Sequence, residues 1–247
     1  FHAEIAAQPQ RPDGYNHLAQ AILYRALYRA GLLENSLVSG DDLLMSLIRQ
    51  PKLALCADDE RAFEQALAAA ARTADQALSR NGNDAAALYA RGVEHGLRAN
   101  YDFLVRKAWF AALRESTAAR RLHNRAAQID PSNADAVLMQ GVQEYVVASL
   151  PAALRLLGAV TGLRGDKQHG LALIERVAQQ GDSSRVEARM VLFTLYRHEK
   201  KPWSAMSYLY ALRRDYPRNY LLHLAEIYTD IEMRDERAAS DALRALE

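Results

Sequence analysis

The seven histidines and the single cysteine are the residues of this chain whose types could bind a metal ion or act as a nucleophile. No two histidines lie three or four residues apart, so the helix-borne His-x-x-x-His arrangement of metal sites is absent from the sequence. Cys56 has no second cysteine to pair with, and no Gly-x-Ser-x-Gly motif marks a serine nucleophile. The sequence therefore predicts a protein that is not an enzyme, with no catalytic residue, no metal and no cofactor. We expect His95, His123 and His223 to be packed or hydrogen-bonded.

A glycine-rich segment, Gly162-Leu-Arg-Gly165-Asp-Lys167, has some features of a phosphate-binding loop. It lacks the Gly-Lys-Ser/Thr ending that such loops use to hold phosphate and magnesium. We interpret the segment as a turn in which Asp166 is buried or caps a helix, in preference to a nucleotide site.

The segment between Arg98 and Arg125 is rich in basic residues, with seven against two acidic ones. Such a segment forms either a solvated outer helix face or a patch that meets an acidic peptide, a phospholipid headgroup or nucleic acid. The whole chain has a net charge of only +1, which argues against bulk nucleic-acid binding. We favour the solvated face and expect no nucleic-acid partner.

The most apolar window, residues 146–163, approaches the length of about 20 residues that a membrane-spanning helix needs. Pro151, Arg155 and two glycines within it disfavour a transmembrane segment, and packing between helices is the preferred interpretation. The alternatives are an apolar pocket or peripheral contact with a membrane surface.

The composition is typical of an all-α protein. Half of the residues are hydrophobic and a quarter are charged, while 12 glycines and 7 prolines are few for 247 residues. Helical spacing of apolar residues predicts helices over about 15–30, 58–80, 219–230 and 234–246, with a helix after Asp84 that this residue caps. We expect residues 1–13 to be extended, Asp41 or Asp42 to start a short helix, and the thiol of Cys56 to be buried or neutral.

A joint between two helices lies between Ala126 and Gly141. The pair Ile129-Asp130 ends one helix because Pro131 cannot continue it, and Ser132 or Asn133 can cap the next. Small residues at Ala119, Ala126 and Gly141 allow neighbouring helices to approach closely. A second segment, Val186 to Pro217, has the same features at ordinary spacing.

These two segments resemble tetratricopeptide repeats (TPRs), helix–turn–helix units that repeat about every 34 residues. The resemblance implies a right-handed α-α superhelix, a TPR-like solenoid formed by one domain over residues 1–247. Its parts would be an atypical first repeat (1–83), two elongated repeats (84–133 and 134–185), a standard repeat (186–217) and a terminal helix pair (218–247). The spacings from Gly92 to Ala119 and from Gly141 to Gly170 exceed the ordinary one and predict helices lengthened by about two turns.

The central segments Tyr101–Trp109, Ser149-Leu-Pro-Ala and Gly165-Asp-Lys167 resemble long-helix bacterial TPR proteins of undefined function, many of them exported. They are more loosely similar to a eukaryotic long-helix TPR family associated with protein inclusions and lipid droplets, and to TPR lipoproteins that accompany periplasmic transporters. The resemblance implies binding, with a periplasmic or exported location favoured over a cytoplasmic one. The first residue is Phe1 instead of Met, which fits the removal of a leader segment.

In TPR proteins the first helices of successive repeats line a concave groove. Carried onto this chain, the groove positions are Tyr89, Val93, Leu97, Leu138, Val142, Tyr145, Met190, Thr194 and Arg197. This lining is mainly apolar and aromatic, which suits an amphipathic helix or apolar segment of a protein partner. The competing interpretation is that neighbouring helices fill the groove.

The expected function is therefore a non-enzymatic scaffold that binds a protein or peptide through this groove. The alternative function, from another class, is a small-molecule or lipid carrier, associated with a transporter, whose pocket lies between the elongated helices near Tyr101, Trp109 and Leu150.

Overall fold

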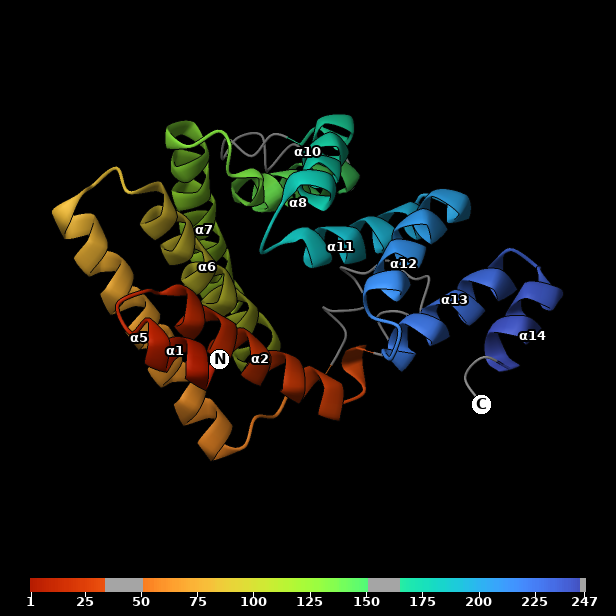
Figure 1. Ribbon diagram of the computed structural model, residues 1–247, viewed down its shortest axis with the longest axis horizontal. Coiled ribbons are helices and arrows are strands. Elements are labelled where there is room, and N and C mark those ends of the chain that lie inside the picture. Colours follow the sequence, from red (N-terminus) through yellow and green to blue (C-terminus); the bar gives the residue numbers. More distant parts are fainter. Residues whose placement is uncertain (34–50, 151–164, 245–247) are drawn as a thin grey trace. The chain divides into compact units, whose positions relative to one another are not determined.

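The computed structural model describes residues 1–33, 51–150 and 165–244. Within these ranges all regular structure is helical, and no strand occurs (Figure 1). This confirms the all-α fold class. The short helix expected after Asp41 or Asp42 and most of the apolar window 146–163 lie outside the described residues. No helix in the described ranges is long and apolar enough to cross a membrane.

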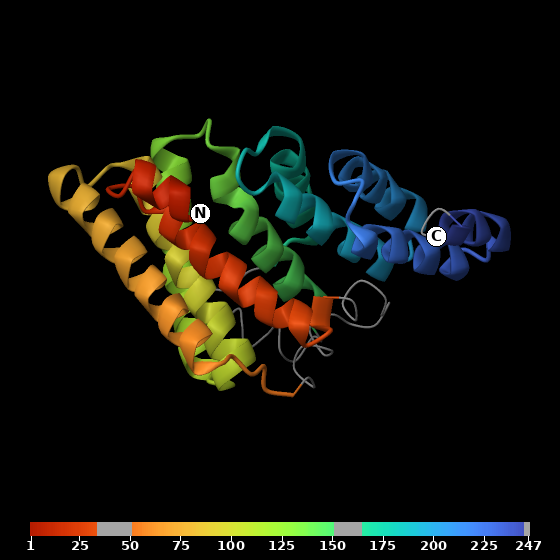
Figure 2. The same cartoon turned by 60° about the horizontal axis from the view of Figure 1, so that its bottom comes forward.

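The contacts group the chain into two compact units, and the expected single domain with its repeat boundaries stays a prediction. The first unit comprises Phe1–Ala30 and Pro51–Gln140. Its helices are α1 (His2–Ala7), α2 (Asp13–Arg29), α5 (Ala57–Arg80), α6 (Ala85–Tyr101), the π-helix η1 (Asp102–Arg106), α7 (Trp109–Ile129) and the 3-10 helix η2 (Ala134–Val137). Each α-helix packs on its neighbour in the chain, and α2 also contacts α6 (Figure 2).

The second unit takes in the described residues from Gly141 onward, together with residues 31–33. Helix α8 (Leu138–Ser149) begins just before this boundary. The following helices are α10 (Lys167–Gln180), α11 (Arg185–His198), α12 (Pro202–Asp215), α13 (Tyr220–Glu232) and α14 (Glu236–Arg244). From α10 to α14, each helix packs on the next one along the chain.

Helices α6 and α7 are longer than the described helices of the second unit, and their assignment to an elongated repeat stays a prediction. These helices have 17 and 21 residues, whereas α11 and α12 have 14 each. The π-helix η1 extends α6, and Lys107 turns the chain in a left-handed conformation with φ 54°. Much of the second lengthened segment, between Gly141 and Gly170, lies outside the described residues.

Side-chain caps start several helices where the sequence predicted them. Asp84 Oδ1 accepts a hydrogen bond from Ala87 N (2.9 Å), and Asp166 Oδ1 accepts one from His169 N (2.9 Å). Helix α7 ends at Ile129 as expected, and Asn133 Oδ1 accepts from Asp135 N at the start of η2. These contacts satisfy N–H groups that have no partner within the helix.

One expectation about the N-terminal part is wrong, and the expectation for Cys56 loses its first alternative, a buried thiol. Residues His2–Ala7 form helix α1 instead of an extended lead-in, because Glu4 and Ile5 pack against Gly14 and Glu4 pairs with His17 of α2. Cys56 is exposed and is itself the N-cap of α5, with Sγ accepting from Asp59 N at 3.4 Å.

Small residues set the closest helix approaches. A Cβ atom at Gly141 would lie 2.8 Å from the carbonyl oxygen of Gly170, so α8 and α10 cross backbone to backbone. A Cβ atom at Gly92 would lie 2.2 Å from Cδ2 of His123, so α6 can carry only glycine opposite that ring. Ala119 and Ala126 of α7 are fully buried.

Candidate functional site

The expected groove residues of α6 lie on one stripe of that helix. Tyr89 and Val93 are half-buried, while Leu97 is buried. The ring of Tyr89 stacks on His123 of α7 with centroids 5.1 Å apart. Leu138, where α8 begins, is also half-buried. Three of the four groove positions in the first unit therefore keep part of their surface open.

In the second unit, the groove positions of α8 and α11 fall into two groups. Val142, Met190 and Thr194 are half-buried. Tyr145 is buried, and its hydroxyl donates to Glu199 Oε1 at 2.6 Å. Arg197 is also buried, with Nε donating to Glu232 Oε2 at 3.0 Å and the guanidinium 5.3 Å above the Phe193 ring.

The contacts of Tyr145 define a small polar cluster between α8, α10 and α11. Lys167 Nζ lies 2.5 Å from Glu199 Oε1 and 5.4 Å from the centre of the Tyr145 ring. Burial pushes the pKa of Glu199 upward, but the hydrogen bonds from Lys167 and Tyr145 outweigh it and hold that pKa below its usual value. The cluster is thus an ionised, internally satisfied contact, in which Tyr145 and Lys167 hold three helices together.

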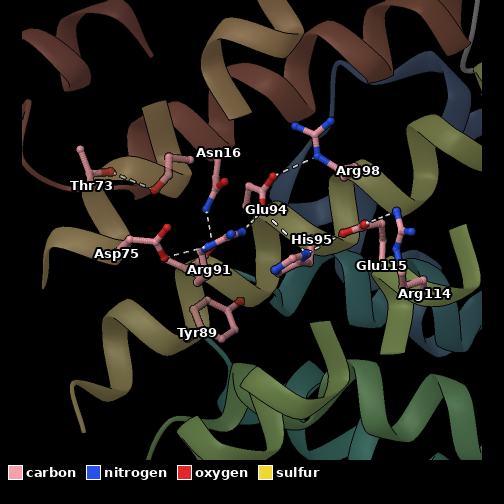
Figure 3. Close-up of polar contacts among 12 residues, drawn as sticks. Asn16, Thr73, Asp75, Tyr89, Arg91, Glu94, His95, Arg98, Arg114 and Glu115 are labelled. Carbon is pink, nitrogen blue, oxygen red and sulfur yellow. Dashed lines mark hydrogen bonds and ion pairs between the residues drawn. The ribbon is translucent and has the colours of Figure 1, made fainter. Parts of the chain in front are cut away.

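Sequence reasoning missed a larger network in the first unit, which Figure 3 shows. Glu94 of α6 is almost fully buried and pairs with Arg91 and Arg98 on its own helix. Arg91 Nε also lies 3.0 Å from Asp75 Oδ1, and Arg98 Nη1 lies 3.2 Å from Glu64 Oε2, both on α5. Each charge therefore meets an opposite charge, which offsets the cost of burying Glu94.

The same network continues to α7. His95 Nδ1 lies 2.6 Å from Glu115 Oε2, and Arg114 lies 3.3 Å from the other oxygen of that carboxylate (Figure 3). Burial alone would raise the pKa of Glu115. The hydrogen bonds from His95 and Arg114 lower this pKa by more than burial raises it, so the net shift is downward. A carboxylate held ionised by two partners is a poor proton donor, so the network is suited to holding α5, α6 and α7 together.

His123 is the most strongly perturbed histidine of the first unit. It is buried against Gly92 and Tyr89, with Nε2 3.2 Å from the Tyr89 carbonyl oxygen and Nδ1 without a partner. Burial lowers its pKa to about 4, so the ring is neutral at pH 7. His123 is thus packed, as the sequence predicted, and Nε2 serves as the donor to the carbonyl oxygen.

The three residues expected near a pocket have different environments. Tyr101 is buried, stacks on Phe63 with centroids 4.9 Å apart and donates to Glu60. Trp109 is partly exposed, with its edge against Phe103, and Leu150 is half-buried. A shallow hollow on the described surface is lined instead by five residues of α5: Ala57, Glu60, Arg61, Glu64 and Gln65.

An unusual carboxyl group lies in the second unit. Asp230 of α13 is 3% exposed, and nearby Glu226 pairs with Arg213 of α12. Burial, together with the charges of Glu226 and Asp235, raises the pKa of Asp230 to about 6. No group of three metal-ligating side chains occurs in the part of the chain that the structure describes.

The charged network of α6 and the carboxyl pair of α13 were not predicted, although the spacing of their residues in the sequence indicates both. Arg91, Glu94 and Arg98 recur at i, i+3 and i+7, the spacing of ion pairs along one helix face. Glu226 and Asp230 are like charges four residues apart, an arrangement that destabilises a helix unless something compensates. Neither pattern reveals burial, which depends on the neighbouring helices.

The chain matches no family model, no curated protein and no solved structure.

Proposed function

We propose that the chain is a non-enzymatic, right-handed TPR-like solenoid that binds a protein partner along the first helices of its repeats, α6, α8 and α11. The observation that carries this proposal is the partial burial of the groove positions. Six of them, in both units, are neither core nor fully exposed: Tyr89, Val93, Leu138, Val142, Met190 and Thr194. Half-covered apolar side chains at regular helical spacing suit the apolar face of a bound helix.

The buried groove positions have a different part in this proposal. Leu97, Tyr145 and Arg197 are almost fully covered, and Tyr145 and Arg197 are engaged with Glu199 and Glu232. They support the shape of the surface and offer little area to a partner. The contact energy is therefore assigned to the six half-buried positions.

The test uses immobilised wild-type chain and two charge-introducing variants, Val93→Arg in the first unit and Val142→Arg in the second. Wild type should capture a specific protein from a lysate of the source cell, and each variant should retain at least about tenfold less of it, because an arginine opposite an apolar helix is left unpaired. Trp203→Arg is the matched control, since Trp203 is 75% exposed on α12 and lies outside the groove positions.

Circular dichroism melting of all three variants separates lost binding from lost folding. Equal capture by wild type and both groove variants would remove the groove assignment. Native mass spectrometry tests the carrier alternative: a bound mass that disappears on denaturation would replace the scaffold proposal. The charged lining of the α5 hollow gives that alternative no support, because a lipid pocket is mainly apolar.

A further inference from the structure

The outward face of α7 differs from the rest of that helix in both charge and polarity. Besides Trp109 and Ile129 at its two ends, the exposed residues of α7 follow helical spacing along one face and are Phe110, Leu113, Arg114, Arg121, Arg125 and Gln128. We call this set the α7 outer face. The only acidic residue of α7 is Glu115, which is buried and bonded to His95. The α7 outer face therefore combines arginines and large apolar side chains without a carboxylate of its own.

The N-terminal end of this face exposes large apolar groups. Phe110 is 91% exposed and Leu113 is 58% exposed, and the adjacent Trp109 is also partly open to solvent. Lys107 lies beside them, with its ammonium group 6.0 Å from the centre of the Trp109 ring. An almost fully exposed phenylalanine gains nothing from folding, so the core of the protein gives no reason for this cluster.

The basic residues around this cluster exceed the acidic ones that remain available. Arg114 and the Arg106 side chain are well exposed. Asp102, the nearest acidic residue before α7, is buried and paired with Arg106.

The segment that leads into α5 lies beside η1, since Leu53 N donates to Leu104 O at 2.9 Å. Of the acidic residues there, Asp58 and Asp59 pair with arginines, whereas Glu60 accepts a hydrogen bond from the neutral Tyr101 hydroxyl and keeps its charge. Between Arg98 and Arg125, seven basic residues stand against the buried Asp102 and Glu115, so the α7 outer face carries a net positive charge.

We propose that the α7 outer face docks on the surface of an anionic lipid bilayer. Phe110, Leu113 and Trp109 enter the boundary between headgroups and acyl chains, while Arg121 meets lipid phosphates. Arg114 and Arg125 join it through the N–H groups that their contacts with Glu115 and Asn83 leave over. From Phe110 to Arg125 the helix rises about 22 Å, so the whole face can lie flat along a membrane. An exposed aliphatic leucine between the aromatic and basic groups favours lipid over nucleic acid, where flat rings would stack on bases. This docking is independent of the groove function.

The first experiment is co-sedimentation of the full chain with vesicles of phosphatidylcholine alone and of phosphatidylcholine mixed with phosphatidylglycerol. We expect binding to the mixed vesicles and little to the neutral ones. Phe110→Ser should weaken vesicle binding about tenfold or more, because a buried phenyl group is lost. Arg121→Gln should weaken it about fivefold. The controls, Trp203→Ser and Arg214→Gln, change a well-exposed tryptophan and a well-exposed arginine on α12 and should bind like wild type.

The second experiment reports where the contact forms. The chain has two tryptophans, so Trp203→Phe leaves Trp109 as the only indole. Adding mixed vesicles should shift the fluorescence of this variant to shorter wavelength, whereas the Trp109→Phe variant, which reports Trp203, should show no shift. Phe110 is exposed, so Phe110→Ser should leave the melting temperature unchanged.

Three results would overturn the proposal. The first is equal binding of wild type and Phe110→Ser to mixed vesicles. The second is binding of a single-stranded RNA through Arg121 without any vesicle binding. The third is a concentration-dependent dimer that Phe110→Ser abolishes, together with no binding of wild type to vesicles. The face would then be an interface between two copies of the chain.

Discussion

The α6–α7 pair of the first unit and the α11–α13 layer of the second are both built from packed helices, but they bury different chemistry. Around α6, the buried residues include Glu94, Glu115 and His123, and charged partners on α6 and α7 satisfy the two carboxylates. The α11–α13 core is instead a cluster of Phe193, Ala205, Met206, Leu209, Leu212, Leu222 and Ala225. Arg197, Glu226 and Asp230 are also buried in α11–α13 but lie outside this apolar cluster, so the contrast is between a charged network around α6 and an apolar cluster between α11, α12 and α13.

The two units also hold buried titratable groups that respond to acid in opposite directions. His123 in the first unit has a lowered pKa, so its neutral form is favoured by folding. Asp230 in the second unit has a raised pKa, so its protonated form is favoured by folding. Lowering the pH should therefore decrease the stability of the first unit, through His123, and increase that of the second unit, through Asp230.

The largest effect is expected in the apolar core. Phe193→Ala should lower the free energy of unfolding by about 4 kcal/mol, because the fully buried ring leaves a cavity among α11, α12 and α13. Urea denaturation measures this loss, with exposed Trp203→Ala as the control that should change little. A loss below about 1 kcal/mol would mean that apolar packing does not dominate this region.

The charged network should give the next largest effect. Glu94→Gln keeps the size of the side chain but removes the charge that Arg91 and Arg98 share, and should cost about 3 kcal/mol. The loss falls at the low end for a buried pair because Asp75 and Glu64 still hold the two arginines. Asp241→Asn, which breaks an exposed pair with Arg244, is the control. Equal losses in both variants would contradict the distinction between buried and surface charge.

His123 should give a pH effect of similar size. Its contribution to stability is fully present above pH 6.5 and is lost as the pH falls toward its pKa of about 4. Between pH 7 and pH 4 this amounts to about 3 kcal/mol. The measurement is the difference in unfolding free energy between wild type and His123→Gln at both pH values, which cancels the other titrating groups. A difference that does not change with pH would show that the ring is not buried as described.

Asp230 should give a smaller effect of opposite sign. The penalty for its charge is absent below pH 3.8 and develops as the pH rises through about 6, reaching about 2 kcal/mol between pH 4 and pH 7. Asp230→Asn should therefore be more stable than wild type at pH 7, and the gain should shrink at pH 4. Asp230→Asn that destabilises the protein at pH 7 would indicate a cation partner for this carboxylate.

Much of the helix pattern followed from the sequence because its signals are local. Asp84 and Asp166 cap the helices that they were expected to start, and α7 ends just before Asp130-Pro131. The start of the chain was misjudged, because His2–Ala7 has no long apolar pattern and gains its contacts from α2.

The candidate site was less accessible to sequence reasoning. The groove positions could be placed on helices by spacing, but spacing could not tell that Tyr145 and Arg197 would be buried and engaged while Val93 and Val142 stay partly open. Similarly, Arg114, Arg121 and Arg125 read as a solvated face. The structure adds that Phe110 is exposed and Glu115 is buried, so this face presents an apolar group and arginines to solvent without a carboxylate.

The sequence by itself determined which segments are helical and where many of them begin and end, since capping, proline and periodicity act within a few residues. The tertiary structure decided which charges are buried, which aromatic groups stay exposed and how the pKa values of His123 and Asp230 diverge. Those properties depend on desolvation and on partners brought from other helices, and no local pattern encodes them.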